Sequence, residues 1–456
     1  MENINNNINS VLKLLEANNL DKAKLLLDII IEQQPENPLI LFLFSQFYLK
    51  KKKYKKSIHF LERVNIAAPN KPNTKIALAN LYLKISNYSK CYSILCEIEE
   101  LAKNIVAFFQ LKGNYYKAIG DIDNSIINYE KALKLLRNSR FWGNKYSGKT
   151  IIDPIQYNTF RYASKSKLEH DLNQIDYLIK TVNLPIHKEQ KNLREVINSW
   201  SKSVDDDKLI YLDEKNYNLI KNFYNRVMYI SQYTKTNHSA LNEKTNFSNL
   251  ETKYFESDQP IVVIDNFLCE ETLQLLWKYC LESTIWFDSK ENGGYLGAYM
   301  TDAFHHPALI QIAKDLRQKM PKIFDKKKLC QMWALKYKSG GKGTRLHADD
   351  ALVNLNFWIT PDESKQNLDN NSGIEIYDKP VPDDWRFEEY NQSDLKIKEH
   401  LIKTKPEKIE IPYKQNRAVL FDSKFIHKSQ SINFKKGYTN QRINITMLFD
   451  KQIRNF

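Results

Sequence analysis

Cysteine is scarce in this chain, and its few copies follow no pattern of metal binding or disulfide pairing. The 456 residues include five cysteines, none of them in a CxxC pair. An odd number of scattered cysteines argues against a disulfide framework and favours a reducing compartment. The sequence therefore predicts a cytoplasmic protein that does not depend on disulfide bonds.

Signals for export and membrane insertion are also missing. The first residues, MENINNNINSVLKLLEANN, lack the basic start and apolar core of a secretory signal. The longest apolar run, PLILFLFSQFYL, is interrupted by polar residues and falls short of the ~18 residues that cross a bilayer. We therefore expect no membrane partner.

Positive charge is plentiful, but it is not gathered into a recognition motif. The net charge is +14, mostly from lysines spread along a chain that is also rich in Asn and Ile. A basic chain invites a nucleic-acid hypothesis, yet no DNA- or RNA-binding motif is present, so nucleic acid is not the expected partner. The length and the 42% hydrophobic content predict two or three domains with substantial cores.

Residues in the first third of the chain recur every 34 positions. The recurring positions are Pro35 and Pro69; Tyr48, Tyr82 and Tyr116; Ala23, Ser57, Cys91 and Ser125; Ser45, Ala79 and Gly113; and Leu27, Leu61, Leu95 and Tyr129. Such a period predicts a pair of antiparallel helices per repeat, with small residues where the two helices cross. Proline would end the second helix, and Lys103 and Arg137 replace it in the last two repeats.

The period and the pattern resemble the tetratricopeptide repeat over residues 1–137. The first repeat departs from it, with Val11 and Leu14 at the small and tyrosine positions. The resemblance implies an α-solenoid whose concave face docks a protein or peptide. A plain helical bundle without a groove is the alternative that the spacing leaves open.

Residues 138–255 lose this period and are expected to form a helical connector and linker. Apolar residues return at helical spacing within SKLEHDLNQIDYLIKTV and QKNLREVINSW. His170 and Asp171 are neighbours there, and adjacent side chains on a helix diverge by about 100°, so we expect surface or capping roles for them. The polar segment before Pro260 is expected to be a linker or an extended arm.

The character of the sequence changes again near residue 256. Residues 260–268 predict a strand, and residues 269–283 predict a helix with acidic residues in its first turn. The other strand candidates are GGYLGAYM, LCQMWALKYKSGG, SGIEIYD, RAVLFDSKFIHKS and QRINITMLFD. Many short strands between Gly, Asn, Asp and Pro predict a sandwich or jelly roll over residues 256–456. The predicted fold class is multidomain α + β.

Two side chains that bind metals open one apolar run of this region. In GTRLHADDALVNLNFWIT, residues 343–360, His347 and Asp349 are two apart and would point to the same side of a strand. A third candidate, His427, ends the strand candidate NRAVLFDSKFIH. Two histidines and one carboxylate are the ligand set of non-haem Fe(II) oxygenases. A hydrogen-bonded strand-end histidine at 347 and a turn residue at 427 are the plainer alternatives.

An arginine lies inside the last strand candidate. Alternation puts Arg442, Asn444 and Thr446 on one face of that strand. A strand-interior arginine is costly unless an anion pairs with it, and a carboxylate matches its planar fork. The position therefore predicts an anionic partner for Arg442.

The His-x-Asp pair, the distal histidine and the later arginine resemble the 2-oxoglutarate and Fe(II)-dependent dioxygenases of the prolyl-hydroxylase-like type. The resemblance covers residues 260–450 and implies a double-stranded β-helix, which is a form of jelly roll. It implies that His347, Asp349 and His427 are the catalytic metal ligands. It also implies that Arg442 binds the far carboxylate of 2-oxoglutarate.

Three further residues belong to the same hypothesis. Lys435 and Lys436 are the other candidates for the anchor of 2-oxoglutarate, since Arg442 lies somewhat further past the distal histidine than is usual. Tyr337 resembles a tyrosine that touches this co-substrate. The segment KPVPDDWRFEEYN is expected to be a lid or substrate loop, with Trp385 and Phe387 as pocket residues or buried anchors.

The implied activity is hydroxylation of a C–H bond with Fe(II), 2-oxoglutarate and O₂, and with ascorbate as an accessory. The substrate would be a protein, a peptide or another molecule docked partly by the repeats. Two alternatives stay open. One is an interaction scaffold with a purely structural jelly roll, and the other is a cupin-like metal protein that does not use 2-oxoglutarate.

Overall fold

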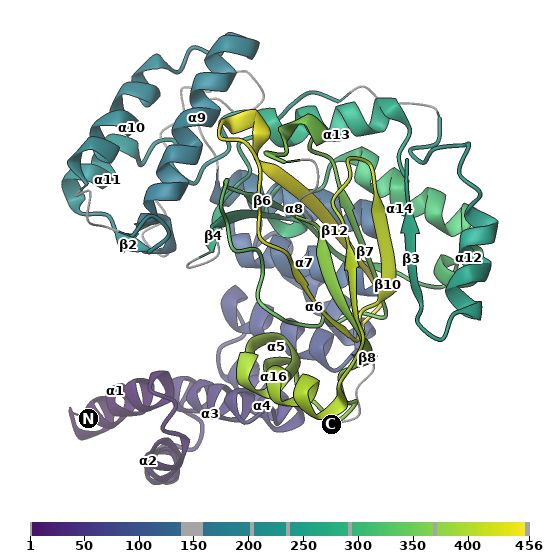
Figure 1. Ribbon diagram of the computed structural model, residues 1–456. Helices are drawn as coiled ribbons and strands as arrows, with labels where there is room; N and C mark the ends of the chain where they lie inside the picture. Colours follow the sequence, from purple (N-terminus) through teal and green to yellow (C-terminus); the bar gives the residue numbers. More distant parts are fainter. Residues whose placement is uncertain are drawn as a thin grey trace. The chain divides into compact units, whose positions relative to one another are not determined.

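Two compact units make up the chain, Met1–Leu135 and Leu136–Phe456 (Figure 1). The computed structural model describes residues 2–137, 158–200, 205–233, 238–290, 294–367 and 372–451. The division between the units falls two residues before the expected end of the repeat array. The further boundary expected at residue 255 stays a prediction.

Within the described residues, the first unit consists of four consecutive helix pairs, the last of which ends one residue past the unit boundary. The helices are α1 (Glu2–Glu16), α2 (Leu20–Gln33), α3 (Pro38–Lys50), α4 (Tyr54–Ala67), α5 (Pro72–Lys84), α6 (Tyr88–Glu97), α7 (Val106–Ile119) and α8 (Ile122–Leu136). The second helix of each pair begins at residues 20, 54, 88 and 122, a constant step of 34 residues. The predicted tetratricopeptide-like solenoid is confirmed.

Prolines and side-chain caps set the ends of these helices. Pro35 and Pro69 each follow the last residue of a second helix by two positions, because the residue before a proline avoids helical geometry. Pro38 and Pro72 open the next helices, where a missing N–H costs nothing. The Asn37 side chain accepts a hydrogen bond from the Leu39 N–H and caps α3.

Small residues lie where paired helices cross, as the sequence predicts. The Ser57 hydroxyl donates to the Ser45 carbonyl over 2.8 Å, and the Ser125 hydroxyl donates to the Gly113 carbonyl over 2.9 Å. A Cβ atom on Gly113 would come within 2.5 Å of the Tyr129 ring. A larger residue at that position would therefore push α7 and α8 apart.

The second unit begins with a helical layer that has its own core. It contains β1 (Tyr162–Ala163), α9 (Lys165–Val182), α10 (His187–Ser199), β2 (Ile210–Tyr211) and α11 (Glu214–Ile220), and α10 lies beside both α9 and α11 (Figure 1). The expectation of a linker or extended arm before Pro260 is wrong. That segment contains α12 (Phe247–Glu256), because Asn246 caps it and Phe247 is buried.

After α12, the described second unit contains two antiparallel sheets and the helices that accompany them. The strand orders of the sheets are β3-β10-β7-β12-β6-β5-β4 and β11-β8-β9. The strands are β3 (Ile261–Ile264), β4 (Asp288–Lys290), β5 (Tyr295–Tyr299), β6 (Leu329–Tyr337), β7 (Val353–Trp358), β8 (Ile374–Pro380), β9 (Lys408–Ile411), β10 (Ala418–Asp422), β11 (Phe425–Ser429) and β12 (Arg442–Phe449). The accompanying helices are α13 (Glu270–Glu282), α14 (Pro307–Lys319), α15 (Pro321–Phe324) and α16 (Asp394–Thr404). The predicted C-terminal β region is confirmed.

One apolar core joins the two sheets. Trp358 and Phe421 from the large sheet pack with Ile376 and Phe425 from the small sheet. Side chains alternate along each strand, so the neighbours of these residues point away from this core. The inner faces of β6, β7 and β12 therefore determine which polar groups are enclosed between the sheets.

The segment RAVLFDSKFIHKS is two strands rather than one. β10 pairs within the large sheet, and β11 pairs with β8 in the small sheet. The chain turns between them at Ser423 and Lys424, where the Lys424 N–H donates to the Asp422 carboxylate over 2.8 Å. This corner carries His427 into the small sheet.

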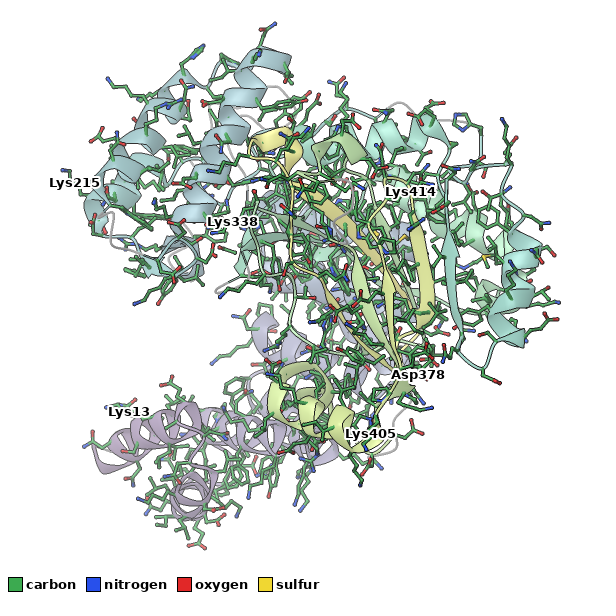
Figure 2. The ribbon with its side chains drawn as sticks, viewed as in Figure 1. Lys13, Lys215, Lys338, Asp378, Lys405 and Lys414 are labelled. Atoms are coloured by element: carbon green, nitrogen blue, oxygen red, sulfur yellow. The ribbon has the colours of Figure 1, made fainter. Side chains whose placement is uncertain are left out.

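The labelled lysines of the second unit lie on separate elements. Figure 2 shows Lys215 on α11, Lys405 at the end of α16 and Lys414 before β10. Lys414 lies 3.1 Å from the Asp265 carboxylate, so part of this charge is already paired. Among the described residues, no helix is both long enough and apolar enough to span a membrane.

Candidate functional site

The three predicted metal ligands converge at the edge of the small sheet. His347, Asp349 and His427 each offer a ligand atom, and these atoms all lie within 4.8 Å of one another. The Asp349 carboxylate lies 3.5 Å from His427 Nε2 and 4.0 Å from His347 Nε2. The fold therefore brings together residues from two distant segments of the chain.

Backbone hydrogen bonds hold this cluster. The His347 N–H donates to the His427 carbonyl over 3.1 Å, and the His427 N–H donates to the His347 carbonyl over 2.8 Å. The prediction that His347 and Asp349 share a regular strand is wrong, because His347 forms only an isolated bridge. The Ala348 N–H instead donates to the Tyr390 carbonyl, and the Asp349 N–H donates to the Ser423 carbonyl.

The hydrogen bonds of the two imidazoles determine which nitrogen faces the cluster. His347 Nδ1 lies 2.8 Å from the Arg345 carbonyl, and His427 Nδ1 lies 3.0 Å from the Phe425 carbonyl. A carbonyl only accepts, so each Nδ1 carries the proton and each Nε2 keeps a lone pair. Two lone pairs and one carboxylate thus face one another, an arrangement that a cation stabilises.

Burial and neighbouring groups keep His347 and Asp349 in their metal-binding forms. Burial and the nearby His427, opposed by the Asp349 carboxylate, lower the pKa of His347 to about 4. Burial alone would raise the pKa of Asp349, but the two histidines and a hydrogen bond from Asn354 together hold it below its usual value. At neutral pH His347 is unprotonated and Asp349 is ionised. The donor set fits a divalent metal ion.

Arg442 is the second feature of the site. Its guanidinium is 1% exposed and lies 4.9 Å from the Tyr337 ring centroid, 5.7 Å from that of Trp358 and 5.8 Å from that of Tyr413. One Nη donates weakly to the Gly373 carbonyl over 3.3 Å, and Nε is buried without a hydrogen-bond partner. Among the described residues, no carboxylate forms an ion pair with this cation. The surroundings therefore suit an anionic ligand.

The structure also places the other predicted residues. Lys435 and Lys436 are exposed, unlike Arg442. Tyr337 is fully buried on β6 directly opposite Arg442, and its hydroxyl lies 3.2 Å from the Ser429 hydroxyl. Trp385 is a buried anchor, whereas Phe387 is 41% exposed. Tyr390, the third aromatic residue of this segment, is also buried at 1% exposed.

Sequence reasoning missed the amides between the metal ligands and Arg442. Asn354 and Asn356 lie on the inner face of β7, and both are buried. The sequence VNLNFW carries the signal, because two amides alternate with apolar residues in a strand that is otherwise hydrophobic. Tyr413, which lies beside Arg442, has no such signal because it is in a loop before β10.

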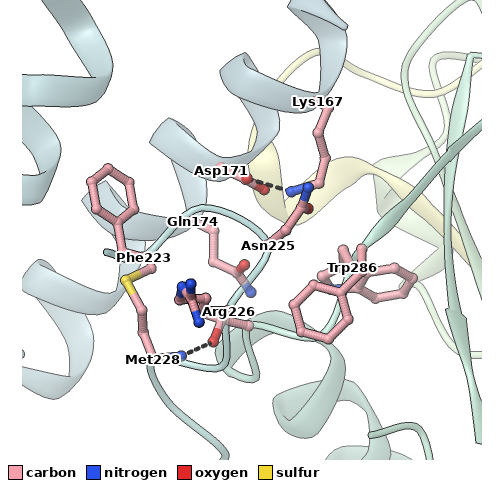
Figure 3. A pocket seen from close by; sticks show the side chains of 10 residues that line it. Lys167, Asp171, Gln174, Phe223, Asn225, Arg226, Met228 and Trp286 are labelled. Atoms are coloured by element: carbon pink, nitrogen blue, oxygen red, sulfur yellow. Dashed lines mark hydrogen bonds and ion pairs between the residues drawn. The ribbon is translucent and has the colours of Figure 1, made fainter. Parts of the chain in front are cut away.

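A second buried polar cluster lies beside α9. The expectation that His170 and Asp171 are surface or capping groups is wrong, because His170 is 3% exposed and its Nδ1 lies 3.1 Å from the Asp171 carboxylate. Asp171 also pairs with Lys167, as the dashed line in Figure 3 shows. Burial and the neighbouring Lys336 together lower the pKa of His170 to about 3, against the opposing effect of Asp171. This cluster ties the helical layer to the rest of the unit.

A family model matches part of the first unit. Residues 16–98 match the family model described as anaphase-promoting complex, cyclosome, subunit 3. No curated protein matches the chain. The family match covers a minor part of the chain and concerns the repeats alone.

Several solved structures resemble a similar portion of the chain. A Pseudomonas aeruginosa PilF structure is 16% identical, with 30% of this chain and 62% of that chain covered and a TM-score of 0.28. YrrB, described as a TPR protein with an unusual peptide-binding site, is 18% identical over 28% of this chain and 67% of its own, with a TM-score of 0.26. A MamA crystal structure is 17% identical over 27% and 72%, with a TM-score of 0.26. These scores are too low to carry an argument.

Proposed function

We propose that this protein is an Fe(II)- and 2-oxoglutarate-dependent dioxygenase that hydroxylates a C–H bond. The observation that carries the proposal is the convergence of His347, Asp349 and His427, whose ligand atoms lie within 4.8 Å of one another. A two-histidine, one-carboxylate set is the one that non-haem Fe(II) oxygenases use. The buried Arg442, which lacks a described carboxylate partner, adds a position for an acidic co-substrate.

The strand order supports a double-stranded β-helix. The chain alternates between the sheets, from β6 in the large sheet to the His347 segment in the small one, and back to β7. β8 and β9 then lie in the small sheet, β10 in the large, β11 in the small and β12 in the large. This winding is what a jelly roll requires. The ligands then lie where the His347 segment meets β11.

The roles of the side chains follow from their positions. His347 and His427 would each offer Nε2 to the iron, and Asp349 would offer a carboxylate oxygen. With 2-oxoglutarate and O₂, the bound iron would supply the oxidising chemistry that hydroxylates a C–H bond. Arg442 would bind the far carboxylate of 2-oxoglutarate, and the surrounding Tyr337, Trp358 and Tyr413 rings would exclude water and so strengthen that pairing.

The repeat array would dock a protein or peptide substrate. Helix pairs of this kind typically bind such partners, and each pair buries its core mainly against its neighbours. The same observation favours a second candidate function, a protein-interaction scaffold without catalysis. The two candidates differ in whether the second unit binds metal and 2-oxoglutarate.

The deciding experiment measures Mn(II) and 2-oxoglutarate binding to the full-length protein by calorimetry, and then iron-dependent succinate release with ascorbate present. Asp349→Ala should abolish metal binding and succinate release without unfolding the chain, because it removes an anionic ligand and leaves the apolar core intact. Lys435→Ala, an exposed control, should match the wild type. A folded wild-type protein that binds neither ligand would leave the scaffold as the better account.

A further inference from the structure

A chain of buried amides connects the two ends of the proposed site. Asn354 on β7 and Asn444 on β12 are each at most 4% exposed, and Asn356 lies between them at 6%. Buried carboxamides are costly unless their donors and acceptors are paired. These three side chains, the amide relay, lie between Asp349 and Arg442.

Every hydrogen bond of the amide relay runs in the same direction. Asn354 Nδ2 donates to the Asp349 carboxylate over 2.6 Å, and Asn356 Nδ2 donates to Asn354 Oδ1 over 2.6 Å. Asn444 Nδ2 donates to Asn356 Oδ1 over 3.1 Å, and Arg442 Nη1 makes a longer contact of 3.5 Å with Asn444 Oδ1. The relay thus begins at a buried cation and ends at a buried anion.

This polarity has a physical consequence. Each donor in a hydrogen-bond chain polarises the next, and the low dielectric of the interior strengthens the effect. An amide that donates to a ligating carboxylate also fixes its orientation, and losing such a partner typically costs about 10- to 100-fold in metal affinity. Satisfying buried amides alone would require no common direction and no connection to either charged end.

We propose that the amide relay positions Asp349 for metal binding and couples the metal site to the anion held by Arg442. Asn354 and Asn356 are positioning residues, since they act through Asp349. The proposal rests on the proposed function, because it takes Asp349 as a metal ligand and Arg442 as the anchor of a carboxylate. Coupling between two sites is reciprocal, so 2-oxoglutarate and metal should each tighten the binding of the other partly through the relay.

The test compares Mn(II) binding by calorimetry in full-length variants, with and without saturating 2-oxoglutarate. Asn356→Leu interrupts the relay without touching Asp349 or Arg442. It should weaken Mn(II) binding about fivefold or more and reduce the tightening produced by 2-oxoglutarate by a similar factor. Asn354→Leu should weaken Mn(II) binding about 10- to 100-fold. Asn356→Ser, which is polar but too short to reach Asn354, repeats the test if the leucine variant does not fold.

The matched control is Thr446→Val. The Thr446 hydroxyl accepts from Asn444 Nδ2 over 3.4 Å and donates to Asn356 Oδ1 over 2.7 Å, parallel to the direct hydrogen bond of 3.1 Å between Asn444 and Asn356. Its removal leaves that direct bond, and so the path from Arg442 to Asp349, and should leave Mn(II) affinity unchanged. Asn356 variants that keep wild-type Mn(II) affinity and wild-type tightening by 2-oxoglutarate overturn the relay while the metal site stands. A wild-type protein that binds no Mn(II) overturns both the relay and the proposed function.

Discussion

Replacing Arg442 with methionine should weaken 2-oxoglutarate binding while leaving the stability of the ligand-free protein nearly unchanged. The guanidinium is 1% exposed, its Nε lacks a partner, and no described carboxylate pairs with it. Methionine fills a similar volume without a buried charge, so the loss of contacts with the aromatic rings is offset by the removal of a desolvated cation. We expect the free energy of unfolding without ligand to change by less than about 1.5 kcal/mol.

The effect on 2-oxoglutarate binding should be far larger. An unpaired carboxylate facing an apolar side chain costs on the order of 3–5 kcal/mol, or about 150- to 5,000-fold in dissociation constant. At 100 times the wild-type dissociation constant, the ligand stabilises the wild type by about 2.7 kcal/mol. The same concentration should stabilise Arg442→Met by only about 0.3 kcal/mol or less.

The assay is chemical denaturation with and without 2-oxoglutarate, in the presence of Mn(II). Lys435→Met is the matched control, because Lys435 is exposed on the loop before β12 and its loss should change neither quantity. If Arg442→Met keeps the ligand-dependent stabilisation while Lys435→Met or Lys436→Met loses it, the anchor is one of the lysines. If all three variants respond like the wild type, the anion site has been assigned wrongly.

Three more predictions address other parts of the chain. Removing residues 1–135 should preserve Mn(II) and 2-oxoglutarate affinity but weaken action on a docked substrate; the cut must spare Arg137, which pairs with Asp302 in the second unit. A truncated protein that hydroxylates its substrate at the full-length rate would falsify the docking role. Gly113→Val should destabilise the repeat array by about 1–3 kcal/mol, because of the close Tyr129 ring, and should leave Mn(II) binding unchanged. Burial and the nearby His305 together lower the pKa of His306 to about 3. The unfolded state therefore binds more protons below pH 6.5, and unfolding free energy should fall by about 2 kcal/mol between pH 7 and pH 5 from this residue. His306→Asn keeps the N-cap of α14. Its unfolding free energy, measured by urea titration at both pH values, should therefore fall less than that of the wild type. An equal fall in the two proteins would contradict the assignment to His306.

The repeat array could be predicted almost completely from the sequence. Helix pairs with a 34-residue step depend on local periodicity and on contacts between neighbouring repeats. Gly113 and Tyr129 illustrate this, since both are 34-residue counterparts of other positions and they pack against each other. The unit boundary was harder to place, because Arg137 ends the repeat pattern in sequence but contributes its side chain to the second unit.

The residues of the candidate site could be named from the sequence, but their convergence could not. His347, Asp349 and His427 are recognisable ligand types, whereas their proximity depends on the corner between β10 and β11 and on one isolated bridge. The sequence also suggested a regular strand at His347, although the Ala348 backbone is bound by Tyr390 from a distant loop.

Whether a polar side chain such as His170 is buried is likewise decided by the tertiary structure alone. Residues at similar positions on a helix or in a loop have the same local pattern whether they face water or a core, so His170 was expected at the surface and is buried. Alternation in β7 and β12 determined that Asn354, Asn356 and Arg442 share inner faces. Only the register between those strands decided that their polar atoms meet, because pairing across a sheet is set by contacts distant in sequence.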